Sequence, residues 1–259
     1  MGNSRLGVLL KTRLWRQVVW LISDDASAPQ IASATWEATQ KSLERAAQDP
    51  SFTLAFYLIA DLVHSAGDFG TNDFLERWQI PRDTETPAID LITSYHTILD
   101  EHARNIGRRT DLGEIAQQAA SETLTHILDE RTNGLFEAKS GDVHQVLRDF
   151  GTTKNFGQLA HEFFSRFLQR SLTYFLSREL ANHVGPGRRF VNLDQHNEFR
   201  KALSVHSRQT AKIVEDFAGE WFSKAEFQGD VTQDRTNRFL WRALEKIKGE
   251  INREAPADD

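Results

Sequence analysis

One apolar stripe, running through residues 156–183, constrains the fold of this chain more than any other feature. Its members recur at steps of three, four and seven residues, the spacing that places side chains on one face of an α-helix. They are Phe156, Leu159, Ala160, Phe163, Phe164, Phe167, Leu168, Leu172, Phe175, Leu176 and Leu180. Because each phenylalanine can bury about 150 Å² or more, we predict a central helix surrounded by others. The alternative is a hydrophobic ligand groove or a seam for a partner helix.

The rest of the chain also favours helices. Glycine and proline number only 15 and 6 in 259 residues, and no segment alternates β-branched and polar residues as a half-buried strand does. We therefore predict an all-α fold, a bundle of about nine or ten helices. The expected helices cover residues 5–23, 29–48, 51–66, 71–79, 88–106, 112–131, 142–150, 156–183, 195–227 and 233–253.

The clearest internal linker is the segment 81–87, where two prolines bracket a polar run that has nothing to bury. It predicts an N-terminal helical sub-bundle over 1–80 and a C-terminal one over 88–253, built on the 156–183 helix. The chain is long enough for either one large domain or two packed sub-bundles. The tail 254–259 is acidic and contains a proline, so we expect it to be disordered.

Composition excludes several classes of protein. A formal charge of −6 argues against a surface built entirely to bind phosphate backbone. The absence of cysteine excludes disulfides, cysteine-ligated metals and thiol nucleophiles, and it fits a cytoplasmic protein. The first apolar stretch, 6–22, is interrupted by Lys11, Arg13 and Arg16, so we expect neither a membrane span nor export.

No motif in the sequence specifies a reaction. The nucleophile elbow, the phosphate-binding loop and the dinucleotide fingerprint are all missing. Histidine and carboxylate residues pair at helical spacing, but the carboxylate set of a di-metal bundle is incomplete. We therefore expect no catalytic residue, no cofactor and no metal site. If the protein is an enzyme, His161 or His183 is its best acid–base group.

One segment, 183–212, differs in charge from its surroundings. It holds six cationic residues and two acidic ones, an excess of four positive charges in a negative chain. Two glycines around a proline end the long helix there and present two arginines on a turn, which suits phosphate or carboxylate binding. The alternative is a helix cap with solvated arginines that pair with neighbouring acidic faces. The candidate anion- or partner-binding residues are His183, Arg188, Arg189, Arg200, Lys201 and Arg208.

Three functional hypotheses follow, in order of preference. The first is a non-enzymatic helical binding protein, a subunit or adaptor of a larger assembly with a protein partner. The second is a protein that binds nucleic acid or another anionic ligand through the basic segment 183–212. The third is an enzyme of unrecognised type.

Overall fold

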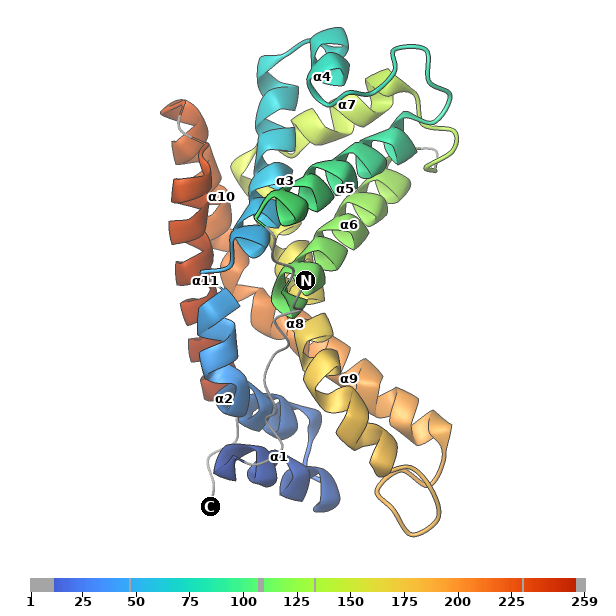
Figure 1. Cartoon of the computed structure of the whole chain (residues 1–259), viewed down its shortest axis with the longest axis vertical. Coiled ribbons are helices and arrows are strands. Elements are labelled where there is room, and N and C mark those ends of the chain that lie inside the picture. Colours follow the sequence, from blue (N-terminus) through green and yellow to red (C-terminus); the bar gives the residue numbers. More distant parts are fainter. Residues whose placement is uncertain (1–11, 47, 107–109, 133, 230, 255–259) are drawn as a thin grey trace.

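The computed structural model describes residues 12–46, 48–106, 110–132, 134–229 and 231–254, and these residues form helices and no strand (Figure 1). The all-α prediction is confirmed. The part of the predicted first helix before residue 12 and the tail residues 255–259 lie outside the described residues. The helices are α1 (Arg13–Ser23), α2 (Ala28–Ala46), α3 (Pro50–Asp68), α4 (Thr71–Arg77), α5 (Pro87–Asn105), α6 (Asp111–Arg131), α7 (Ser140–Asp149), α8 (Thr153–Asn182), α9 (Leu193–Ala211), α10 (Ile213–Phe227) and α11 (Gln233–Glu254).

Local capping chemistry sets where several of these helices begin. Asp49 accepts hydrogen bonds from the first backbone amides of α3, and Pro50 follows it at a position where a missing N–H costs nothing. Thr152 and Asn192 cap α8 and α9 in the same way. In the described part of the chain, no helix combines the length and apolar character needed to span a bilayer.

The apolar stripe of α8 is buried, which confirms that it belongs to the core. Its first half, from Phe156 to Leu168, contributes to a large core with residues of α3, α6, α10 and α11. Its second half, from Leu172 to Leu180, belongs to a smaller core with residues of α1, α2 and α9. A single long helix therefore connects the two hydrophobic cores of the molecule, and Figure 1 shows it crossing the middle of the fold.

The larger core draws on both sides of the linker predicted at 81–87. Phe56 of α3 lies within 6.4 Å, between ring centroids, of aromatic rings on three helices that follow the linker. Those rings belong to Phe156, Phe163, Phe164, Trp221 and Phe239. Whether residues 1–80 fold by themselves stays a prediction.

The helix predicted over 195–227 is wrong in one respect, because the chain breaks at Lys212 into α9 and α10. The amide of Lys212 donates to the carbonyl of Gln209 rather than to that of Arg208. The Arg208 carbonyl instead accepts a hydrogen bond from Nε2 of His161 on α8, at 2.8 Å. A side chain that replaces a bond of the helical ladder is a recognised cause of a helix kink. This break raises the number of helices above the predicted nine or ten.

Two glycines let α10 lie very close to the first half of α8. A Cβ added at Gly157 would be 2.2 Å from the carbonyl oxygen of Glu215, and one at Gly219 would be 2.0 Å from that of Thr153. No side chain fits at either position. The break at Lys212 allows α10 to follow α8 at this short distance while α9 follows the second half of α8 with larger side chains between them.

Candidate functional site

The turn that ends α8 adopts the conformation predicted for it, but one of its arginines is used inside the fold. Gly185 and Gly187 both have positive φ, as their place after the helix requires. The Arg189 side chain is only 8% exposed. Its guanidinium donates to the carbonyls of Leu21 and Ile22 at the end of α1 and of Ala26 just after it. Arg189 therefore fastens the turn to α1 and has little surface left for an anion.

The other residues of the predicted 183–212 site are spread from the end of α8 along α9 and do not converge. Arg188 is exposed and donates to the carbonyl of Asn182, the last residue of α8, and His183 is the half-buried residue that ends this helix. Arg200 and Lys201 are exposed on α9. Arg208 lies fifteen residues from the start of α9, about 22 Å along the helix axis. The six predicted residues therefore belong to at least two separate surfaces.

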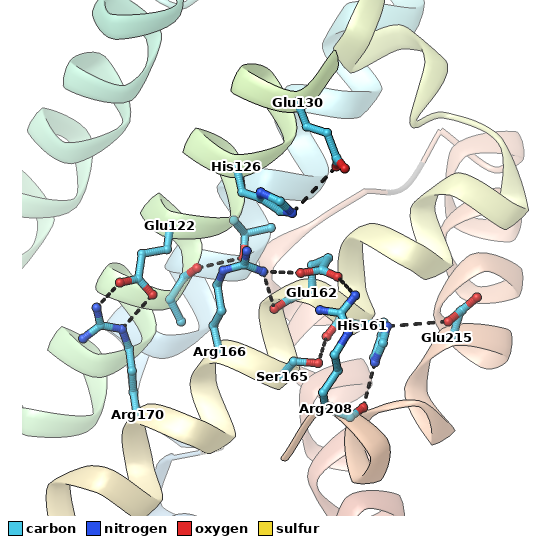
Figure 2. A network of polar contacts seen from close by, with 12 residues as sticks. Glu122, His126, Glu130, His161, Glu162, Ser165, Arg166, Arg170, Arg208 and Glu215 are labelled. Carbon is cyan, nitrogen blue, oxygen red and sulfur yellow. Dashed lines mark hydrogen bonds and ion pairs between the residues drawn. The ribbon is translucent and has the colours of Figure 1, made fainter. Parts of the chain in front are cut away.

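Arg208 belongs to a polar network between α6, α8 and α9 (Figure 2). Both Arg208 and Arg166 donate to Glu162. Burial raises the pKa of the Glu162 carboxyl, but the hydrogen bonds from Arg208 and Arg166 outweigh it and leave the pKa below its ordinary value. Glu162 is therefore held as an anion, and it fixes the position of Arg208.

His161 sits beside this ion pair, in the kind of place where an acid–base residue would be sought. Its Nε2 donates to the Arg208 carbonyl, and its Nδ1 lies 3.7 Å from the Glu215 carboxylate. Because protein groups face both ring nitrogens, neither is directed to a substrate. In the described residues, no three histidine, aspartate or glutamate side chains lie close enough to share a metal ion.

A second basic surface, which the sequence analysis missed, lies between α10 and α11. A groove of about 660 Å³ separates these two helices along one side. Among the residues that the structure describes, its walls carry five cationic side chains and one acidic one, Glu220. The cationic residues are Lys224 of α10 and Arg235, Arg238, Arg242 and Lys246 of α11. We call this surface the basic groove.

The floor of the basic groove is aromatic. The rings of Trp221 and Phe239 stack at 4.5 Å between centroids, with an interplanar angle of 23°. Phe217 packs against Phe239 at 5.4 Å, and the Lys246 ammonium lies 5.3 Å from its ring. Phe239 is buried, whereas Trp221 and Phe217 are partly exposed toward the groove.

Two of the groove cations have no partner within the described part of the chain. Arg235 donates to Gln228, and Arg238 forms an exposed ion pair with Asp234 on its own helix. Lys224 and Arg242 are exposed and form no ion pair or side-chain hydrogen bond with other described residues. Their charges are therefore available to an external anion at the cost only of displacing water.

The signal for this groove was present in the sequence, but not as a basic run. Arg235, Arg238, Arg242 and Lys246 follow one another at steps of three, four and four residues, which places them on one face of α11. Of the acidic residues, only Glu245 stands between them, but Asp234, Glu250 and Glu254 lie on either side, so the net charge over 233–254 is only +2. Only the packing of α10 adds Lys224 and the aromatic floor.

Comparison with protein-family models, with curated proteins and with solved structures found no match to this chain.

Proposed function

We propose that the protein is a non-enzymatic, cytoplasmic binding protein, a subunit or adaptor, that holds an acidic helical segment of a partner protein in the basic groove. The observation that carries this proposal is the row of cations on α11 beside a partly exposed aromatic floor. Opposite charge on the rim and apolar contact in the centre are the two requirements of a helix-in-groove interface.

The spacing of the row favours a helical partner. Successive cations from Arg235 to Lys246 are about 4.5 to 6 Å apart along the axis of α11, because each residue of an α-helix adds about 1.5 Å. Carboxylates three or four residues apart on a partner helix have the same spacing along its axis. An amphipathic helix lying along the groove would therefore match the cations one by one while its apolar face covers Trp221 and Phe217.

The aromatic residues also favour protein over nucleic acid. The floor rings pack against one another, so they offer no free pair of faces between which a base could stack. Two large apolar side chains flank the groove residues in sequence and are exposed, Phe227 at 93% and Trp241 at 47%. Exposed aromatic residues around a charged groove are typical of a protein interface.

Binding of a designed peptide tests the proposal. The probe is a fluorescein-labelled helical peptide with glutamates at i and i+4 on one side and leucines on the other. We expect wild-type protein to bind it in a salt-dependent manner. We expect the double variant Arg238→Glu/Arg242→Glu to bind at least about tenfold more weakly, because two attractive contacts become repulsive.

Two controls make the outcome specific. The double variant Arg200→Glu/Lys201→Glu has the same change of charge but lies on α9, in the basic segment 183–212, and should bind like wild type. A peptide of the same composition in scrambled order should bind more weakly than the designed helix. The proposal fails if the groove variant binds the designed helix as wild type does. It also fails if a single-stranded dT20 oligonucleotide binds the groove more tightly than the helix, which would identify nucleic acid as the occupant.

A further inference from the structure

A polar cavity of about 390 Å³ lies between α6, α8 and the break that separates α9 from α10. It is separate from the basic groove, and the two share no lining residue. Its walls carry three cations, three carboxylates and two histidines above a small apolar base. The charged and histidine residues are Arg131, Arg208, Lys212, Glu130, Glu162, Glu215, His126 and His161.

Each carboxylate in this cavity already has a basic partner. Arg208 and Arg166 hold Glu162, and Lys212 pairs with Glu215. The imidazole of His126 lies 3.7 Å from the carboxylate of Glu130, as Figure 2 shows. Glu162 and Glu215 are therefore each compensated by a cation and add little net negative charge to repel an anion, while the histidine beside Glu130 compensates it only when protonated.

Arg131 is the cation of this cavity that the fold leaves available. It is the last residue of α6, and its guanidinium lies 4.4 Å from the centre of the Phe150 ring. Within the described ranges its side chain forms no hydrogen bond or ion pair, and its contact is with the Phe150 ring. Stacking on the ring limits the motion of the side chain while leaving the edge of the guanidinium free to donate. The side-chain amide of Gln158, which also lines the cavity, has no hydrogen-bond partner in the same ranges.

We infer that this cavity binds a small organic oxyanion, a carboxylate or phosphate monoester, with Arg131 as its anchor. The fork of the Arg131 guanidinium donates two parallel hydrogen bonds to two oxygens of the anion. Gln158 of α8 and Lys212 at the break between α9 and α10 supply further donors. A volume of about 390 Å³ suits a molecule of metabolite size and is too small for a helix.

Calorimetric titration tests this inference, with glycerol 3-phosphate and succinate as the two probes at constant ionic strength. We expect at least one of them to bind wild-type protein with a Kd below about 10 mM, and the stronger probe identifies the preferred group. Arg131→Gln should weaken that binding at least about tenfold, because the charge and the fork are both lost. Arg104→Gln, an exposed arginine on α5 outside the cavity, should bind like wild type.

Arg131→Lys separates anion recognition from loss of structure. It keeps the positive charge and the aliphatic stem, and it should still weaken binding because it cannot donate in a fork. Thermal unfolding of each variant shows whether the fold is intact, and Arg131→Gln should still bind the acidic helix in the basic groove. The inference is overturned if neither probe binds wild type at about 10 mM, or if Arg131→Gln and Arg131→Lys both bind as wild type does.

Discussion

Arg188 and Arg189 are neighbours of identical chemistry, yet the fold gives them different roles. The side chain of Arg189 is buried over the rings of Phe190 and Phe199, where three carbonyls at and just after the end of α1 accept its hydrogen bonds. Burial lowers the pKa of its guanidinium, and Asp25 at 4.0 Å partly offsets this effect. Arg188 is exposed, so we expect its substitution to have little effect on the free energy of unfolding.

Replacing Arg189 with alanine should therefore destabilise the protein. We expect Arg189→Ala to reduce the free energy of unfolding by about 3 kcal/mol, because buried carbonyls lose charge-assisted hydrogen bonds. Arg188→Ala should change it by less than about 0.5 kcal/mol. Urea denaturation of both variants measures the difference. Equal effects would show that the contacts with α1 contribute nothing to stability.

The pair α8 and α10 is sensitive to a change of side-chain size at two glycines. Their backbones approach at Gly157 and Gly219, where an added methyl group would overlap a carbonyl oxygen of the facing helix. Since the obstacle is backbone on both sides, a rotamer change cannot relieve it. The two helices would have to move apart, and the stacked pair Phe156 and Phe222 lies between them.

The glycines of this contact should not tolerate alanine. We expect Gly157→Ala to reduce the free energy of unfolding by about 2 to 3 kcal/mol, because overpacking outweighs the better helix propensity of alanine. Gly249→Ala on α11 is the matched control. A Cβ there meets no atom within 4 Å, so this variant should gain about 0.5 to 1 kcal/mol. Thermal denaturation shows whether Gly157→Ala lowers and Gly249→Ala raises the stability. A stabilising Gly157→Ala would contradict the close approach of α8 and α10.

At the scale of the whole molecule, α8 joins a large core to a small one, and Phe56 lies at the centre of the large core. Its ring contacts residues from α8, α10 and α11, so the packing of the C-terminal helices depends on a helix near the N-terminus. Such a shared core favours unfolding of the molecule as one unit.

The consequence is measurable with Phe56→Ala. We expect it to reduce the free energy of unfolding by about 3 to 5 kcal/mol, since the aromatic cluster cannot close around the cavity. Helix content from circular dichroism and tryptophan fluorescence should follow one transition in wild type and variant alike. Two separated transitions would mean that the small core unfolds independently of the large one.

Local patterns in the sequence were sufficient to predict most of the helices and the burial of the α8 stripe. Apolar residues at three- and four-residue steps, Asp49 before Pro50, and the glycines after α8 each act within a few residues, so each can be interpreted without knowing the fold. The same reasoning gave an all-α fold and found the turn that carries Arg188 and Arg189.

The positions of the candidate sites depended on contacts between distant residues. The break at Lys212 involves His161, 51 residues away, and Arg189 is buried by carbonyls of α1 more than 160 residues away. The basic groove requires Lys224 and the aromatic floor of α10 beside the cations of α11. The sequence by itself determined the helices and their apolar faces, because those depend on local spacing. Only the tertiary structure decided which charges are consumed inside the fold and which remain on a surface, because pairing depends on which helices meet.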